Sequence, residues 1–430
     1  MKIMCAGRGG ASVHVLTRAC AKTAEVFVLA RRPNPGAMRI ATKSFIFEKI
    51  TPSAAALWAL KEGIEYSIIT DWPSISAGFA DALEKVGVKV ATATKEQCEC
   101  CTDREKLSEI IESSTKHHLP HKITKDVDEA LSFAKEIGSV FISPVKMKGY
   151  FDYYFWNHKK DSTTIAKKAI AKVISKHGEA YLRGRETGQA FAVYGFSNGK
   201  SMKFSPIIYS ENRLYEENQG PGTKGMGSYT AEQLFFLSEA QKEEVYDAVK
   251  RASKKLLEHG YKGVAKFGWH VGKNISFETM VPAIWVPDGI NALSLINGDL
   301  VDVVVRMANE EPFELEFKNR ASIAKVYVPV GFPKITQPRE VKINEMEIIR
   351  SGALLLHHNV SEANRALYSG KGRSLVLYAE GNTLEEAYSK IANAEKGISG
   401  VWGRKDIGNV RIIADKERKL KESIEEIEEG

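Results

Sequence analysis

A glycine-rich segment at residues 218–230 is the part of the sequence best suited to surround a small ligand. It reads NQGPGTKGMGSYT, and Lys224 is its only charged side chain. Glycine leaves the backbone amides unobstructed and tolerates positive φ, so such a segment can approach a ligand closely. A surface loop has a similar composition. We therefore interpret the segment either as a loop that lines a substrate site or as an ordinary surface loop.

A second glycine cluster, Gly7-Arg8-Gly9-Gly10, follows a short apolar run and opens a helical pattern that continues to about residue 23. Backbone N–H groups and a helix N-terminus at such a turn attract anions. The cluster does not extend to G-x-G-x-x-G, because Ser12 stands where the third glycine would be. We therefore expect an anionic ligand here but no dinucleotide cofactor.

The elements that would hold these segments alternate between strands and helices over the first hundred residues. That order is typical of a parallel sheet covered by helices, which binds ligands at the carboxyl ends of its strands. Further along, the sequence predicts a buried strand at 140–145, an aromatic run at 146–156, a hairpin at 180–210, a long helix at 230–260, strands at 263–271 and 274–281, a helix at 289–308, a strand at 323–330 and a helix at 384–397. The chain is thus expected to combine α/β and α+β parts.

The composition is that of a globular protein of roughly two to four domains. The 61 basic residues slightly outnumber the 54 acidic ones, which suits a small anionic substrate better than nucleic acid. An odd number of cysteines, five, argues against a disulfide framework and for a reducing compartment. No apolar run reaches the roughly 18 residues of a membrane span. We expect a cytoplasmic protein without a membrane partner.

Several motifs, taken in chain order, resemble those of the phosphoribosylamine–glycine ligase family, also called glycinamide ribonucleotide synthetase, within the ATP-grasp superfamily. The matching segments are Gly7–Gly10, Asn34–Gly36, Gly220–Tyr229, Pro287–Asn291, Lys325–Pro333, Thr383–Ala387 and Arg404–Gly408. Because they are spread from one end of the chain to the other, the resemblance covers almost all of it.

The resemblance implies a Rossmann-like domain at residues 1–101, a two-lobed ATP-grasp domain at 102–320 and a small C-terminal α+β domain at 321–430. The nucleotide lobe would occupy about residues 120–195. It also implies an ATP- and Mg²⁺-dependent ligase of purine biosynthesis. In that reaction ATP phosphorylates the carboxylate of glycine, and phosphoribosylamine attacks the resulting acyl phosphate.

The positions of the motifs also assign roles to individual residues. Arg213 is the one expected to be catalytic. The nucleotide-binding residues are expected to be Arg104, Lys146, Lys148 and Gly149. The substrate-binding residues are expected to be Gly9, Gly10, Asn34, Gly36, Gly225, Met226 and Gly227. The metal-binding residues are expected to be Glu278 and Asp288.

The sequence departs from the family where ATP and metal should bind. Ser143 replaces a nucleotide-binding lysine, Arg183 and Gly184 replace paired glutamates, and Thr279 and Val281 replace metal ligands. One interpretation is an ATP-dependent ligase with altered or reduced activity. The alternative is a catalytically degenerate family member that acts as a binding or partner subunit. Both interpretations expect an anionic small molecule as ligand.

Overall fold

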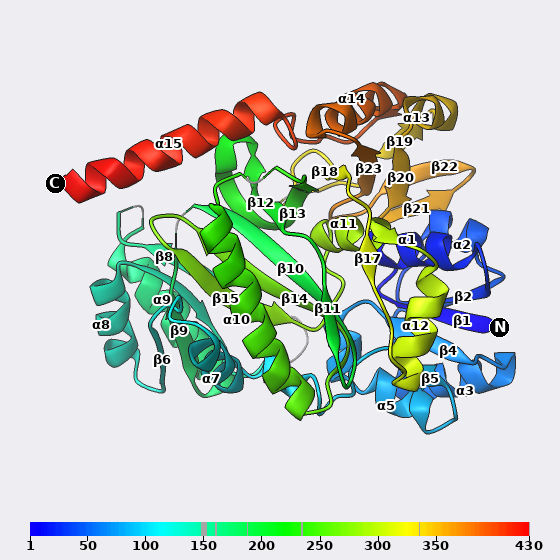
Figure 1. Cartoon of the computed structure of the whole chain (residues 1–430), viewed down its shortest axis with the longest axis horizontal. Coiled ribbons are helices and arrows are strands. Elements are labelled where there is room, and N and C mark those ends of the chain that lie inside the picture. Colours follow the sequence, from blue (N-terminus) through cyan, green and yellow to red (C-terminus); the bar gives the residue numbers. More distant parts are fainter. Residues whose placement is uncertain (148–152, 160, 187, 234, 335, 430) are drawn as a thin grey trace.

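The first hundred residues of the structure, a computed structural model, form a five-stranded parallel sheet in the order β3-β2-β1-β4-β5. The structure describes residues 1–147, 153–159, 161–186, 188–233, 235–334 and 336–429. The strands are β1 (Lys2–Gly7), β2 (Glu25–Ala30), β3 (Lys43–Ile46), β4 (Tyr66–Ile69) and β5 (Lys89–Val90). The helices are α1 (Ala11–Cys20), α2 (Pro35–Ile40), α3 (Pro52–Glu62), α4 (Trp72–Ser76) and α5 (Phe79–Glu84). The predicted α/β unit is therefore present (Figure 1).

The turn between β1 and α1 depends on its glycines. Gly9 has φ +84°, and a Cβ there would lie 2.2 Å from the carbonyl oxygen of Arg32. Any other residue would combine left-handed strain with a collision against backbone that cannot easily move. The turn consequently brings the start of α1 to the carboxyl edge of the sheet, as the sequence predicts.

The next part of the chain is a separate small lobe with its own apolar core, seen in teal in Figure 1. Its antiparallel sheet has the order β6-β9-β7-β8. The strands are β6 (His121–Thr124), β7 (Ser139–Ser143), β8 (Tyr154–Asn157) and β9 (Ala180–Gly184). The preceding and covering helices are α6 (Glu99–Thr102), α7 (Arg104–Ser114), α8 (Val127–Ile137) and α9 (Thr163–His177). Trp156, from the aromatic run, is buried in this core.

A nine-stranded sheet forms the centre of the molecule, in the order β15-β14-β10-β12-β13-β18-β23-β20, with β11 paired to β10. Its strands are β10 (Gln189–Asn198), β11 (Met202–Phe204), β12 (Ile208–Tyr215), β13 (Gln219–Thr230), β14 (Lys262–Val271), β15 (Ile275–Val281), β18 (Ala321–Tyr327), β20 (Leu354–His357) and β23 (Leu375–Gly381). This sheet continues across residue 320, where the sequence predicted a domain boundary.

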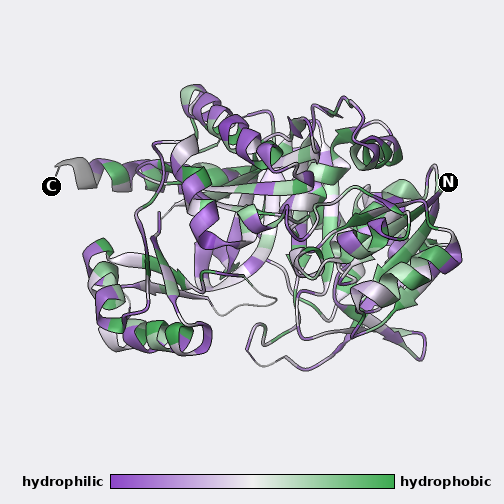
Figure 2. Cartoon of the chain, turned by 90° about the horizontal axis from the view of Figure 1, so that it is seen from below, coloured by the Kyte–Doolittle hydropathy of each residue, from purple (hydrophilic) through white to green (hydrophobic). Residues whose placement is uncertain are grey.

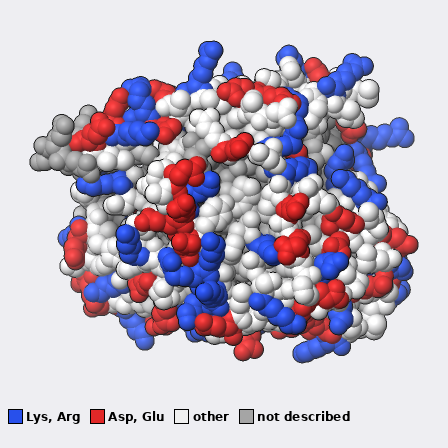
Figure 3. All heavy atoms as spheres, viewed as in Figure 1, with Lys and Arg blue, Asp and Glu red and all other residues white. Residues whose placement is uncertain are grey.

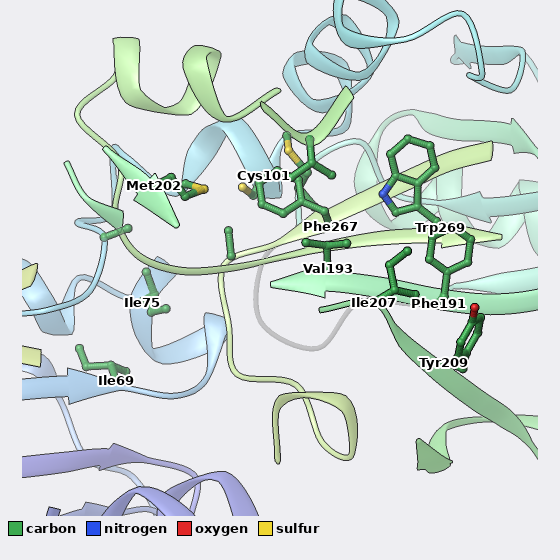
Figure 4. Close-up of a cluster of buried hydrophobic side chains, with 14 of the residues drawn as sticks. Ile69, Ile75, Cys101, Phe191, Val193, Met202, Ile207, Tyr209, Phe267 and Trp269 are labelled. Atoms are coloured by element: carbon green, nitrogen blue, oxygen red, sulfur yellow. The ribbon is translucent and has the colours of Figure 1, made fainter. Parts of the chain in front are cut away.

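Large aromatic side chains fill the core of the central sheet (Figure 4). Trp269 stacks on Phe277 with ring centroids 4.5 Å apart and on Phe191 at 6.1 Å. Such pairs stabilise by about 0.5–1.5 kcal/mol beyond the area they bury. Ile69 of β4 and Ile75 of α4, both in the N-terminal part, belong to the same core. The N-terminal and central sheets are thus joined by one continuous apolar interior.

Two helices beside the central sheet differ from the sequence prediction. The long helix α10 (Glu239–Glu258) begins well after residue 230, because Ser238 and Gln241 form a capping box that fixes its start. The predicted helix at 289–308 is two helices, α11 (Asp288–Ser294) and α12 (Leu300–Asn309). Between them lies the short strand β16 (Ile296–Asn297), which pairs with β17 (Glu316–Phe317).

The C-terminal part adds a second small sheet with the order β21-β22-β19-β24. Its elements are β19 (Glu340–Ile343), α13 (Glu345–Ser351), β21 (Val360–Ala363), β22 (Ala366–Ser369), α14 (Leu384–Ala394) and β24 (Ile398–Ser399). The last helix, α15 (Val410–Glu429), extends away from this part along the top of Figure 1.

Hydrophobic and hydrophilic residues alternate along the helices, and charged side chains lie on the surface. The helices alternate hydrophobic and hydrophilic stretches along their length in Figure 2, as expected for elements with one buried face. Acidic and basic side chains are interspersed over the face shown in Figure 3. In the described part of the chain, no helix combines the length and apolar character that crossing a membrane requires.

Candidate functional site

A basic cavity of about 150 Å³ lies where the N-terminal sheet, the central sheet and the C-terminal part meet. Its walls come from the turn after β1, the residues that follow β2 and β4, the segment 283–286 and the strand β13. Four of the lining side chains are cationic: Arg8, Arg32, Lys224 and Arg373. Positive charges drawn from distant parts of the chain to one concave surface favour a small anionic ligand.

The cations at this cavity are close enough to affect one another. Burial and the charges of Arg373, Arg8 and Arg32 together lower the pKa of Lys224 to about 8, with burial the largest cause. The positive charges of the three arginines repel a protonated Lys224. An anion bound among these four side chains would offset that repulsion.

A neutral histidine closes one wall of the cavity. Burial lowers the pKa of His358 well below its usual range, and the nearby Arg373, Arg32 and Lys224 add to that effect. The neutral ring accepts a hydrogen bond at Nδ1 from the Ala11 amide at 3.0 Å. His358 therefore caps the first turn of α1 and takes up one of its otherwise unpaired donors.

Arg373 joins three backbone segments at the cavity. Its Nη1 donates hydrogen bonds to the carbonyl oxygens of Lys224 at 2.7 Å, Gly225 at 3.2 Å and Val286 at 2.5 Å. The guanidinium thus holds the glycine-rich segment against the residues before α11. Because Nη1 carries only two hydrogens, two of these three carbonyl oxygens share one N–H donor.

The substrate-binding residues predicted in the N-terminal domain lie beside the same cavity. Asn34 donates from Nδ2 to the carbonyl oxygens of Gly9 at 3.0 Å and His357 at 2.8 Å. The Gly36 amide donates to Nδ1 of His357 at 3.1 Å. Gly10 itself lines the cavity. Gly10 therefore lies at the cavity surface, and Gly9, Asn34 and Gly36 form hydrogen bonds or close contacts behind it.

The glycine-rich segment is a strand and not a loop. It forms β13, which pairs antiparallel with β12 and with β18. A Cβ on Gly225 would lie 2.4 Å from Cδ of Pro287, and one on Gly227 would lie 2.4 Å from Cγ2 of Ile407. Met226 between them is completely buried. These glycines therefore allow neighbouring segments to pack closely, while Lys224 just before them faces the cavity.

A second cluster of charged groups joins the small lobe to the central sheet. Arg183, at the end of β9, donates from Nη2 to Oε2 of Glu278 at 2.9 Å and from Nη1 to the Glu278 carbonyl. Nδ1 of His270 lies 3.1 Å from the same carboxylate oxygen. Burial opposes ionisation of Glu278, but the charges of His270 and Arg183 dominate and lower its pKa to about 2.

The other predicted metal ligand also forms an ion pair within the protein. Asp288, in the first turn of α11, is almost fully buried and accepts a hydrogen bond from Nζ of Lys266 on β14.

Arg213, predicted to be catalytic, donates from Nη1 to the carbonyl oxygen of Gly220 at 2.8 Å. Arg213 therefore holds the start of β13 to β12.

The predicted nucleotide-binding residues are not gathered at one point. The Arg104 guanidinium is buried, 5.4 Å from the ring centroid of Phe141 and 6.0 Å from that of Tyr181. Lys146 is 67% exposed, with its Nζ 3.9 Å from a carboxylate oxygen of Asp103. Lys148 and Gly149, also predicted for this role, lie outside the described residues.

The chain is similar along almost its whole length to enzymes of one activity. It is 25% identical over 432 residues to the phosphoribosylamine–glycine ligase of Methanothermobacter thermautotrophicus, covering 96% of this chain and 97% of the relative. It is 27% identical to that of Pyrococcus horikoshii, covering 95% and 94%. A crystal structure of the ligase from Thermotoga maritima superimposes with TM-score 0.76 at 17% identity, covering 95% of this chain and all of the other. No family model matches the chain.

The chain is thus similar over almost its whole length to phosphoribosylamine–glycine ligases, at 25–27% identity. The ATP-grasp fold expected from the sequence motifs is confirmed by the structural similarity. The residue assignments carried over from the family stay predictions, and their surroundings in this structure show what each can do.

The residues of this phosphoribosylamine–glycine ligase homologue do not fit the Mg²⁺ ion that the fold implies. Magnesium requires several oxygen ligands in octahedral geometry. Glu278 is held by Arg183, and Asp288 is held by Lys266. Among the described residues, no group of three or more acidic, histidine or cysteine side chains could hold a metal ion. A cation beside each carboxylate also repels a divalent ion.

Sequence reasoning missed several residues of the cavity. Arg32, Arg373 and His358 were not predicted to bind anything, although all three line the cavity. The only local signal was for Arg32, which follows the parallel strand at 25–30, at the carboxyl edge where site residues are often found. Arg373 carried no such signal, because it acts on segments that are distant in sequence.

Proposed function

We propose that the protein is an ATP-dependent carboxylate–amine ligase of the phosphoribosylamine–glycine ligase type, acting in purine biosynthesis with altered or reduced activity. The observation that supports this most is the basic cavity, because it is built from the segments that resemble the family's substrate loops. Gly10 and Lys224 belong to two such segments, and both line it. A phosphorylated amine has the charge that these walls would bind.

In the proposed reaction a carboxylate oxygen takes the γ-phosphoryl group of ATP, and ADP leaves. The amine nitrogen then attacks the acyl carbon, phosphate leaves, and the nitrogen loses a proton. Arg8, Arg32 and Lys224 would neutralise the phosphate of the amine substrate. Arg373 would keep Lys224 in place through the backbone of β13. Fixing the two reactants in this way converts a bimolecular step into an effectively unimolecular one.

A second candidate function is a binding subunit without catalysis, which could act together with a partner protein. The observation in its favour is that Glu278 and Asp288 are each neutralised by a cation of the chain itself. Such a subunit would keep the basic cavity and bind the phosphorylated amine without converting it.

The two candidates are distinguished by measuring ADP release from the full chain with ATP, glycine and phosphoribosylamine. For the ligase we expect ADP release that depends on both the carboxylate and the amine, and parallel reactions lacking the amine are the control. A second series replaces glycine with other small amino acids, to detect an altered substrate. If no carboxylate supports ADP release while the phosphorylated amine still binds in calorimetry, the binding-subunit function is correct.

A further inference from the structure

Part of the lining of the basic cavity is aromatic and apolar. Trp72, the first residue of α4, contributes to it from the N-terminal part of the chain. Trp285 contributes to it from the segment that joins β15 to α11, and the same segment adds Ala283 and Ile284. The cavity therefore combines its cationic side chains with two indole rings and two aliphatic side chains.

The tryptophans of this wall are held in place by packing and by a hydrogen bond. Trp72, Met147 and Ala283 form a small apolar cluster. Trp285 packs against this cluster, and its indole Nε1 donates a hydrogen bond to the carbonyl oxygen of Lys224 at 3.1 Å. The apolar wall is thus tied to the strand that carries one of the cations. Side chains that are already ordered lose little conformational freedom when a ligand binds.

The apolar wall favours a ligand that has an apolar ring. A sugar hydroxyl that faced Trp72 or Ile284 would leave water without gaining a hydrogen-bond partner, which is unfavourable. A flat ring instead gains from the burial of its apolar surface and from contact with an aromatic side chain. The cavity volume of about 150 Å³ is that of a space which accommodates benzene. One small ring therefore fits beside the tryptophans.

The cations of the same cavity provide the place for an anionic group. Arg8, Arg32 and Lys224 all line it. Burial lowers the pKa of Lys224 and the charges of both arginines add to that decrease, so the three cations lie near one another. Guanidinium groups bind phosphate oxygens through paired hydrogen bonds. A ligand with a phosphate at one end and a ring at the other would contact both kinds of wall at once.

We propose that this cavity binds a phosphate monoester that carries a flat apolar ring of about the size of benzene. Trp72 and Trp285 contact the ring. The phosphate is bound by Arg8, Arg32 and Lys224. The inference rests on the proposed function in taking the cavity as the substrate site, and it adds that the phosphorylated substrate is not a bare sugar phosphate. The two tryptophans are then the residues that determine specificity.

The proposal is tested by isothermal titration calorimetry of the full chain at pH 7, where Lys224 is charged. The probes are phenyl phosphate, cyclohexyl phosphate and ribose 5-phosphate. We expect phenyl phosphate to bind more tightly than ribose 5-phosphate by about threefold or more. Cyclohexyl phosphate, whose ring is apolar but not flat, should bind more weakly than phenyl phosphate. If either of the other probes binds as tightly as phenyl phosphate, or if phenyl phosphate does not bind, the proposal is wrong.

Two variants separate recognition of the ring from recognition of the phosphate. Trp285→Leu should weaken binding of phenyl phosphate by about threefold to tenfold, because one aromatic contact is lost, and should leave binding of inorganic phosphate unchanged. Arg32→Gln should weaken binding of both by about tenfold or more, because it removes a charge-assisted contact. Equal weakening of both probes by Trp285→Leu would mean that Trp285 acts only by positioning Lys224, and would overturn the proposal.

The matched control is Trp402→Leu, which makes the same change outside the cavity. Trp402 is 37% exposed, and its ring centroid lies 6.1 Å from that of Tyr215. This variant should bind both probes as the unchanged protein does. Circular dichroism of each variant verifies folding, and Trp72→Leu supplies the same comparison if Trp285→Leu does not fold. A loss of phenyl phosphate binding in Trp402→Leu equal to that in Trp285→Leu would contradict a specific site.

The outcome for this inference is separate from that for the proposed function, because binding is measured without ATP or a carboxylate. ADP release with glycine and phosphoribosylamine, together with tighter binding of ribose 5-phosphate than of phenyl phosphate, would leave the ligase function standing and overturn the inference. Preferential binding of phenyl phosphate without ADP release from any carboxylate and amine would support the inference and overturn the ligase function.

Discussion

Lys224 and Glu278 show how strongly neighbouring charges determine the protonation of single side chains in this protein. Burial and three arginines lower the pKa of Lys224 to about 8. His270 and Arg183 outweigh burial at Glu278 and lower its pKa to about 2. Glu278 therefore remains ionised across the neutral range. Lys224 alone of this pair changes its charge within the pH range in which enzymes are usually assayed.

Anion binding in the basic cavity should consequently weaken as the pH rises through about 8. The folded-state pKa of Lys224 is lowered, so the lysine loses its proton earlier than an exposed lysine does. Below pH 8 it is charged and attracts a phosphate ester, and above pH 8 that attraction is lost. Calorimetric titration of ribose 5-phosphate at a series of pH values measures the effect.

Lys224→Met is the control for this prediction. The variant should bind the sugar phosphate more weakly at neutral pH by about tenfold, the effect of losing one charge-assisted hydrogen bond. Its binding should then show no further decrease near pH 8. If the variant and the unchanged protein have the same pH dependence, another group is responsible.

At the scale of elements, the sequence predicted the fold better than it predicted the individual segments of the site. The alternation of strands and helices before residue 100 and the helix predicted at 384–397 follow from hydrophobic patterning and capping residues, which are local signals. The segment 219–230 was predicted as a loop and is the strand β13. Glycine usually weakens strands, and only the neighbours Pro287 and Ile407 explain why bare positions are needed.

Elements that are distant in sequence explain what patterning could not predict. His358 accepts its hydrogen bond from Ala11, 347 positions earlier in the chain. Arg373 donates to the carbonyl oxygen of Lys224 on β13, 149 positions earlier in the chain. The same holds for the predicted metal ligands, because the pairing of Glu278 with Arg183 depends on how the small lobe meets the central sheet.

The packing of β13 leads to a prediction about two of its glycines. Gly227→Ala should lower the free energy of unfolding by about 1–3 kcal/mol, because the added methyl would press on the fully buried Ile407. Gly222→Ala, in the same strand, should change it by less than about 0.5 kcal/mol, because its nearest contact would be 3.9 Å away. Urea unfolding monitored by circular dichroism measures both. Equal losses in the two variants would show that backbone flexibility matters here and close packing does not.

At the scale of the whole molecule, a buried cluster of charges fastens the C-terminal part to the central sheet. Arg404 donates to Glu211 of β12 at 2.9 Å and to Asp406, and Lys416 of α15 donates to Glu211 at 2.8 Å. Arg404, Glu211 and Asp406 are almost completely buried. These contacts supplement the backbone pairing of β13 with β18, which crosses the same boundary.

Arg404→Met should therefore destabilise the whole protein strongly. Removing one partner of a buried ion pair typically costs about 3–5 kcal/mol, and here it leaves the carboxylates of Glu211 and Asp406 with Lys416 as their shared cation. Arg418→Gln, which removes an exposed ion pair on α15, is the control and should leave stability unchanged. Urea unfolding followed by tryptophan fluorescence measures both. A small effect of Arg404→Met would mean that water reaches this cluster.

The uninterrupted central sheet limits how the protein could be shortened. A chain cut at residue 320, where the sequence suggested that one domain ends, would lose β18, β20 and β23. The backbone of Gly227 to Thr230, now paired with Ser322 to Lys325, would become an open edge with free amides and carbonyls. Such an edge is a template for pairing with another molecule. A fragment of this kind would self-associate and would not behave as an isolated catalytic unit.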